Sequence, residues 1–260
     1  MTDRGPVKPR IQVFADPSAL TRAAAEFFAE TARRAVVRRG CFTVALAGGS
    51  TPRGLYQMLA QGKFSRPIDW PRVHLFWGDE RCVPPGDPES NYGMVAETLL
   101  EGPAIPPHHI HPMDGSGEPR RAAAQYEQTL RRLFPEGAAA LDLVLLGMGA
   151  DGHTASLFPH AEPVAKTVTG AETRWVAAVQ VPQSDDWRIS LTPRFINSAD
   201  CVVFLVAGRA KAQTLARVLA GPYQPLELPA QLIRPSGGSA TWMVDAAAAK
   251  LLDASTRGAS

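Results

Sequence analysis

The sequence lacks the features that would place it in a membrane, on a nucleic acid or outside the cell. Its 260 residues contain no apolar run of the roughly 18 residues that a membrane-spanning helix needs. The formal net charge is only +2, which gives no general attraction for nucleic acid or for an anionic lipid surface. We therefore expect no nucleic-acid or membrane partner, and an anionic ligand would have to be met by local charge.

Cysteine is scarce as well. The three cysteines, Cys41, Cys82 and Cys201, lie far apart and none has the spacing of a metal-binding pair. An odd number of isolated cysteines is typical of reduced thiols and not of a disulfide framework. The first ten residues contain no apolar core, so a secretory signal peptide is not expected. These absences predict a cytoplasmic protein without disulfides.

The chain does contain a regular alternation of short apolar runs and helical segments. Strands are predicted at residues 11–14, 42–47, 73–77, 141–146, 175–179, 188–191, 201–206 and 241–244. Helical patterns lie between most of them, and no break in composition marks a linker. This order predicts a single α/β domain over residues 1–260, with one doubly wound, mainly parallel sheet and helices on both faces.

The central feature is the segment 141–159. Its apolar run reads as a strand buried on both faces, and the run ends in Gly147-Met148-Gly149-Ala150-Asp151-Gly152-His153. The glycines satisfy the dinucleotide pattern G-x-G-x-x-G, but Pro159 excludes the long helix which that pattern opens. Ligands of parallel sheets bind outside the carboxyl ends of the strands. We therefore interpret the segment as a turn that presents an acid and a base.

His153 is the candidate base, because imidazole titrates near neutral pH and can take a proton from water. A carboxylate beside it would fix its tautomer. Asp151 and Asp79 are both candidates for that carboxylate, and the sequence leaves the choice open. A serine nucleophile is disfavoured because the chain has no G-x-S-x-G motif.

Two further segments predict an anion site. The strand 42–47 runs into Gly48-Gly49-Ser50-Thr51-Pro52, which predicts a hydroxyl cap with proline at the first helical position. Such a helix start offers N–H groups, hydroxyls and a positive dipole end, although an ordinary capped turn has the same pattern. Lys211 lies in the first turn of a later predicted helix, where a cation opposes the dipole. Binding of an anion would explain it, and a solvent-facing lysine is the alternative.

Two charged or titratable clusters allow more than one interpretation. Asp79, Glu80 and Arg81 follow the strand 73–77, either as part of a ligand site or as a solvated loop with a salt bridge. Histidines 108, 109 and 111 suggest a metal site, but their spacing suits no single face and no cysteine or carboxylate completes a ligand set. We expect no metal.

These motifs, in this order, resemble those of the 6-phosphogluconolactonase family, and the resemblance covers nearly the whole chain. It rests on residues 47–52 (AGGSTP), 77–81 (WGDER), 90–92 (SNY), 147–159 (GMGADGHTASLFP), 188–192 (RISLT) and 208–211 (GRAK). The resemblance implies the fold of glucosamine-6-phosphate deaminases and ribose-5-phosphate isomerases. It also implies hydrolysis of 6-phospho-D-glucono-1,5-lactone, a small-molecule substrate, to 6-phosphogluconate without metal or organic cofactor.

By position, the resemblance implies roles for individual residues. His153 would activate water, supported by Asp151 or Asp79, and Arg81 would stabilise the oxyanion. Asn91 and Gly149 would contact the sugar. The phosphate would be held by the glycine loop and two cations, namely Gly48, Gly49, Ser50, Thr51, Arg188 and Lys211. We expect a monomer or a weak homodimer.

Two other functions compete with lactone hydrolysis. The related amino-sugar-phosphate deaminases carry a glutamate just before the proline that follows the histidine, and this chain has Phe158 there. An apolar side chain cannot relay protons, so the lactonase is favoured. A non-catalytic sugar-phosphate sensor would usually add a DNA-binding segment, for which the chain has no spare length or basic run.

Overall fold

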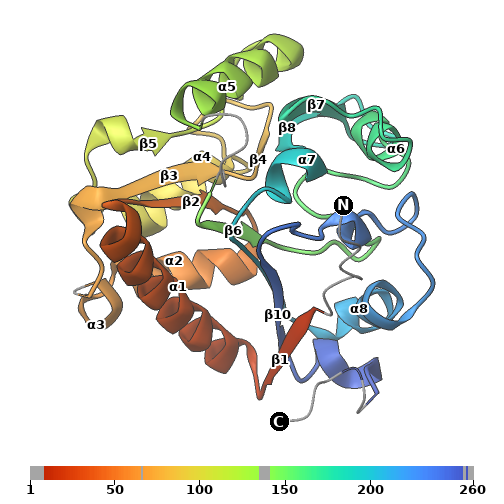
Figure 1. Ribbon diagram of the computed structural model, residues 1–260, viewed down its shortest axis with the longest axis horizontal. Coiled ribbons are helices and arrows are strands. Elements are labelled where there is room, and N and C mark those ends of the chain that lie inside the picture. The colour runs from red at the N-terminus through yellow and green to blue at the C-terminus, as the bar shows by residue number, and fades with distance from the viewer. Residues whose placement is uncertain (1–8, 66, 135–140, 254–255, 257–260) are drawn as a thin grey trace.

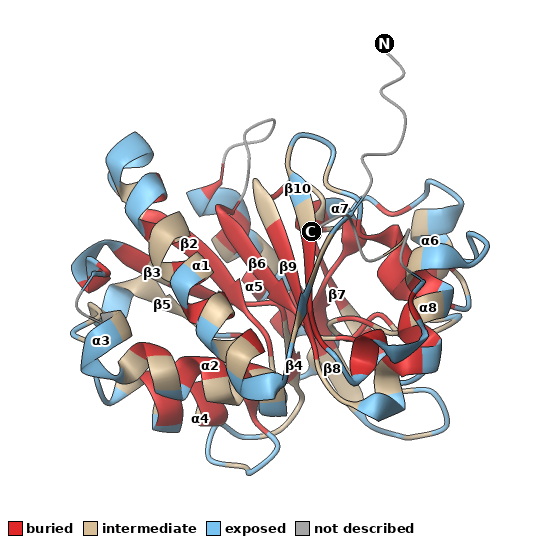
Figure 2. Cartoon of the chain, turned by 90° about the horizontal axis from the view of Figure 1, so that it is seen from below, coloured by how far each residue is buried: buried red, intermediate tan, exposed pale blue. Residues whose placement is uncertain are grey.

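The computed structural model describes residues 9–65, 67–134, 141–253 and 256 (Figure 1). Its main sheet has seven strands in the order β1-β10-β9-β6-β2-β3-β5, and every pairing between neighbours is parallel. The strands are β1 (Arg10–Phe14), β2 (Phe42–Leu46), β3 (Val73–Trp77), β5 (Ile110–His111), β6 (Leu143–Leu146), β9 (Cys201–Val206) and β10 (Ser239–Asp245). Figure 2 shows the central strands as a buried band between helices whose outward sides are exposed, and the edge strands β1 and β5 are only partly buried.

The helices cover both faces of this sheet, as predicted. From β1 to β5 the chain moves across the sheet in one direction, and from β6 to β10 it moves in the other. Because crossovers between parallel strands are right-handed, the two directions place their helices on opposite faces. On one face lie α1 (Pro17–Arg39) and α2 (Ser50–Ala60), and on the other α5 (Pro119–Leu133), α7 (Pro193–Ile196) and α8 (Ala212–Ala220) (Figure 1).

A second, antiparallel sheet was not expected from the sequence. Its order is β4-β8-β7, and its strands are β4 (Asp79–Arg81), β7 (Val176–Gln180) and β8 (Trp187–Leu191). The loop interpretation of residues 79–81 is therefore wrong. Side chains alternate along a strand, so Asp79 and Arg81 share one face while Glu80 points to the other and is buried.

The remaining elements are short. The helical ones are α3 (Gly62–Ser65), α4 (Asn91–Val95), α6 (Glu162–Val168), a π-helical turn η2 (Ala96–Leu100), and the 3-10 turns η1 (Trp70–Arg72), η3 (Pro107–His109), η4 (Arg209–Lys211), η5 (Pro229–Leu232) and η6 (Ala248–Leu251). None of the helices in the described part of the chain is both long and apolar enough to cross a bilayer.

A buried carboxylate, that of Asp142, lies at the amino ends of β2 and β6. Asp142 is 2% exposed, and its Oδ2 accepts bonds from the N–H of Thr43 at 2.9 Å and from its hydroxyl at 2.8 Å. Its Oδ1 pairs with Arg38 at 3.2 Å and with Arg39. Since a buried charge is tolerated only when it is fully paired, this cluster fixes the C-terminal end of α1 on the sheet.

The histidines of β3, η3 and β5 form a stack and not a ligand set. The rings of His74 and His109 lie 3.7 Å apart between centroids, and His74 Nδ1 lies 3.4 Å from His111 Nε2. Among the described residues, no group of three or more His, Cys, Asp or Glu could hold a metal ion. Burial, reinforced by the charges of neighbouring histidines, lowers the pKa of His74 and of His111 to about 4.

This stack predicts an acid-sensitive fold. An unfolded histidine has a pKa of about 6.5, so between about pH 6.5 and 4 the unfolded chain binds protons that the folded stack refuses. Stability is therefore complete above this window and falls as the pH drops through it. The melting temperature, measured by circular dichroism at pH 7 and pH 5, should fall less in His111→Phe than in the unmodified protein, by a few degrees.

The control is His160→Gln, because His160 is exposed and pairs with Glu227 outside the stack. It should keep the acid sensitivity of the unmodified protein. Identical pH dependence in His111→Phe and the unmodified protein would contradict the prediction.

Candidate active site

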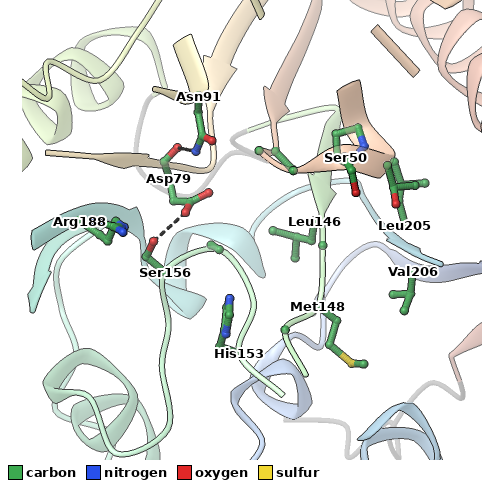
Figure 3. Close-up of a pocket in the computed structure, with 18 of the residues that line it drawn as sticks. Ser50, Asp79, Asn91, Leu146, Met148, His153, Ser156, Arg188, Leu205 and Val206 are labelled. Atoms are coloured by element: carbon green, nitrogen blue, oxygen red, sulfur yellow. Dashed lines mark hydrogen bonds between the residues drawn. The ribbon is translucent and has the colours of Figure 1, made fainter. Parts of the chain in front are cut away.

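A cavity of about 420 Å³ opens at the carboxyl ends of β2, β6 and β9. Strands β2 and β6 are neighbours in the main sheet, and the next main-sheet strands after them, β3 and β9, lie on opposite sides of this pair. The connections that leave these two strands go to opposite faces, and they leave a crevice between them, which is where ligands of such sheets bind. The second sheet forms a further wall, through β4 and β8 (Figure 3).

All but one of the residues predicted for the site line this cavity. They are Gly48, Gly49, Ser50, Thr51, Asp79, Arg81, Asn91, Gly149, His153, Arg188 and Lys211. The exception is Asp151, which lies behind His153 and touches its ring. The cavity also has an apolar side that was not predicted, formed by Leu146, Met148, Phe158, Leu205 and Val206 (Figure 3).

His153 is paired with Asp151 and not with Asp79. The His153 Nδ1 atom lies 2.6 Å from Asp151 Oδ1, whereas the Asp79 carboxylate accepts a bond from Ser156. Partial burial acts to raise the pKa of Asp151, but the hydrogen bond and charge of His153 outweigh it, and the pKa lies below its ordinary value. Asp151 is therefore ionised at neutral pH and holds the proton of His153 on Nδ1, which leaves Nε2 as the basic nitrogen.

The turn that carries this pair is fixed by its own backbone. The N–H of Gly149 donates to the carbonyl of His153 at 2.8 Å, and the Thr154 hydroxyl donates to the carbonyl of Gly147 at 2.8 Å. A Cβ on Gly149 would lie 2.2 Å from His153 Nδ1 and 2.4 Å from Asp151 Oδ1. Only glycine at position 149 lets the backbone approach the pair so closely.

Two arginines occupy paired positions on adjacent strands of the second sheet. Arg81 and Arg188 are register partners in the antiparallel pair β4–β8. Arg81 donates to the main-chain carbonyl of Glu89, and Arg188 donates to its neighbour's carbonyl at 3.0 Å. Like charges directly opposite each other destabilise a sheet. Such a pair, with no carboxylate partner among the described residues, is the arrangement that an anion would stabilise.

The glycine loop and Lys211 add to this positive region. Helix α2 begins at Ser50 after Gly49, whose φ is +103°, and it has no side-chain cap. The predicted hydroxyl cap is therefore wrong, and Pro52 lies at the third helical position. Without a cap, the first N–H groups and the hydroxyls of Ser50 and Thr51 stay available to an anion. Lys211 is the residue before α8 and lines the same cavity.

Glu80 is a structural carboxylate and not part of a solvated salt bridge. It is 1% exposed and accepts N–H bonds from Arg81 at 2.8 Å and from Asn91 and Tyr92, both at 2.7 Å. Burial raises its pKa against the opposing effect of these bonds. Glu80 thus fixes the start of α4 on β4.

Asn91 is positioned by this start of α4. Its Nδ2 donates to the carbonyl of Asp79 at 2.8 Å (Figure 3). A Cβ on Gly48 would lie 1.9 Å from its Oδ1, so glycine is required where the loop after β2 meets this amide.

Comparisons with known proteins identify the family of the chain. The family model described as glucosamine-6-phosphate isomerases/6-phosphogluconolactonase matches residues 15–242. The chain is 40% identical to a 6-phosphogluconolactonase of Haemophilus influenzae over 80% of this chain and 87% of that protein. It is 39% identical to one of Nostoc over 93% of this chain and 98% of that protein.

Solved structures give the same result. The chain is 30% identical to the 6-phosphogluconolactonase of Trypanosoma brucei, with a TM-score of 0.83 over 95% of this chain and 99% of that one. A monomeric glucosamine-6-phosphate deaminase shares the fold, with a TM-score of 0.77 at 19% identity. By the family model and by these relatives, the chain belongs to the glucosamine-6-phosphate isomerase/6-phosphogluconolactonase family, and within it to the 6-phosphogluconolactonases.

Proposed function

We propose that this chain is a cytoplasmic hydrolase that converts 6-phospho-D-glucono-1,5-lactone to 6-phospho-D-gluconate, in the oxidative pentose phosphate pathway. The observation that supports this function is that the His153–Asp151 pair shares one cavity with three cations, Arg81, Arg188 and Lys211. A base and a group of cations in one cavity suit a substrate with an electrophilic carbonyl at one end and a phosphate at the other. The whole chain would act as one domain, as a monomer or a weak homodimer.

The phosphate would bind first and orient the sugar. Arg188 offers a guanidinium fork that matches two phosphate oxygens, and Lys211 adds a point charge. The N–H groups at the start of α2, with Ser50 and Thr51, would complete the contacts. Asn91 and Gly149 line the same cavity and would contact the sugar.

His153 would then act as the general base. With its Nδ1 proton held by Asp151, Nε2 takes a proton from a water molecule while the water oxygen attacks C1 of the lactone. The carbonyl electrons move onto the oxygen, and the charge of Arg81 stabilises the resulting oxyanion. When the carbonyl re-forms, the bond from C1 to the ring oxygen breaks, and His153 returns its proton to that oxygen. No step requires a cofactor.

The deaminase reaction is disfavoured by the other neighbour of His153. The Phe158 ring lies 4.9 Å from the imidazole between centroids, and a phenyl ring cannot carry a proton. Lactone hydrolysis needs only a base and support for the oxyanion, so an apolar residue beside the base is compatible with it.

Removal of the base should abolish most catalysis. His153→Ala should lower kcat by about 10²–10⁴-fold, and Asp151→Asn should lower it as well, because the amide no longer requires a proton on Nδ1. Lactone would be generated by glucose-6-phosphate dehydrogenase, and 6-phosphogluconate would be followed with spontaneous hydrolysis subtracted. The control His160→Ala changes a histidine outside the cavity and should keep the full rate. A wild-type kcat in His153→Ala would refute the proposal.

Removal of the phosphate contacts should weaken substrate binding. Arg188→Ala and Lys211→Ala should each raise KM for the phosphorylated lactone by about 10–100-fold, the usual range for a charged hydrogen bond. Their rates with unphosphorylated gluconolactone should change little. Arg209→Ala is the matched control, because Arg209 is an exposed cation of the same turn. Equal use of both lactones by the unmodified protein would contradict the phosphate assignment.

A methyl group at position 149 should disturb the base without removing it. Gly149→Ala should lower kcat by about 10²-fold, because its Cβ would displace the pair by about an ångström. Gly147→Ala is the control, since a Cβ there has nothing within 4 Å, and it should lose far less activity. If both alanine variants show the same kcat, the close packing around the pair does not matter for catalysis.

A further inference from the structure

Ser156 links the turn that carries His153 to the second sheet. It is 2% exposed and lines the cavity. Its hydroxyl donates to Asp79 Oδ2 at 2.6 Å, and its N–H donates to Ser190 Oγ at 3.2 Å. Figure 3 shows the first bond between the turn and β4. No function assigned so far requires this hydroxyl.

The face of the second sheet explains why the bond to Asp79 matters. Asp79 is the register partner of Ser190, and Arg81 is the register partner of Arg188. Residues two apart in a strand point to the same side, so these four side chains share one face. At such spacings long side chains can reach each other. The Asp79 carboxylate therefore shares one face of this sheet with two guanidinium groups.

Asp79 nevertheless forms no ion pair with either arginine among the described residues. The Asp79 carboxylate accepts a bond from Ser156, and both guanidiniums donate to main-chain carbonyls. Each charged group thus has a neutral partner. A neutral partner orients a charge without compensating it, so Arg81 and Arg188 keep their attraction for an anion.

We propose that Ser156 is a positioning residue, whose hydroxyl holds Asp79 away from Arg81 and Arg188 and so keeps both arginines available to the phosphorylated substrate. The inference rests on the proposed function, because it concerns the same anion site. Without the hydroxyl, the Asp79 carboxylate turns toward the nearer guanidinium and forms an ion pair. An incoming phosphate then has to displace a carboxylate before it binds.

Calorimetric binding of inorganic phosphate and of 6-phosphogluconate to the full chain tests this without any chemistry. Ser156→Ala should weaken the binding of both anions about 10-fold. Asp79→Asn should bind them at least as tightly as the unmodified protein, because an amide cannot form the ion pair. In the double variant, Ser156→Ala should add no further loss to Asp79→Asn. This non-additivity is the result that a merely structural role of Ser156 would not produce.

Two further variants separate the hydroxyl from the turn. Ser190→Ala removes the acceptor of the Ser156 N–H but leaves the bond to Asp79, and it should retain anion affinity. Ser156→Cys keeps the size of the side chain but donates weakly. It should lose affinity as Ser156→Ala does, and it serves as the test if the alanine variant does not fold.

Two outcomes would overturn the inference. One is a folded Ser156→Ala or Ser156→Cys protein that binds both anions as tightly as the unmodified chain. The other is a loss of affinity that persists in full when Asp79 is already asparagine. Failure of the proposed function would be visible separately, as a lack of lactone hydrolysis by the unmodified protein.

Discussion

The site depends on the strand order of the main sheet, in which the chain leaves the neighbouring strands β2 and β6 toward opposite edges. Right-handed crossovers send the connections after these neighbouring strands to opposite faces. The backbone there separates, and a cavity forms without any special side chain. The glycine loop after β2, the histidine turn after β6 and the lysine turn after β9 reach this cavity because parallel strands have all their carboxyl ends at one edge. The fold thus brings together three segments that lie far apart in the sequence.

The second sheet supplies what the main sheet cannot. Loops after parallel strands can provide a base, N–H groups and single cations, whereas two arginines at paired positions require neighbouring strands with a defined register. Strands β4 and β8 provide it, with Arg81 opposite Arg188. The buried Glu80 then anchors β4 to the start of α4 through two N–H bonds, from Asn91 and Tyr92. A carboxylate that the sequence allows either in a ligand site or in a solvated salt bridge is in this way a support for the strand that carries Arg81.

Most of the main sheet, the glycine loop and His153 could be predicted because their signals are local, whereas Asn91 and Arg188 are expected in the site only from the family resemblance. Apolar runs mark the strands of the main sheet, and glycines after two of them mark close approaches of the backbone. What could not be predicted depends on contacts between distant segments. Residues 79–81 are charged and look like a loop, and they become a strand only because residues 188–190 pair with them. The choice between Asp151 and Asp79 beside His153 likewise required the path of the backbone, as did the part played by Ser156.

A charged site that must wait for its substrate has to keep its own charges apart. In this cavity Asp79 shares the lining with the cations Arg81, Arg188 and Lys211. Each charged group is instead hydrogen-bonded to another partner. Asp151 pairs with His153, Asp79 accepts from a serine hydroxyl, and Glu80 accepts from main-chain N–H groups. Both arginines donate to main-chain carbonyls. Because these partners are already in place, the proposed binding of substrate and formation of the oxyanion would require little reorganisation of the protein. The apolar Phe158 beside the base likewise adds no further charge next to His153.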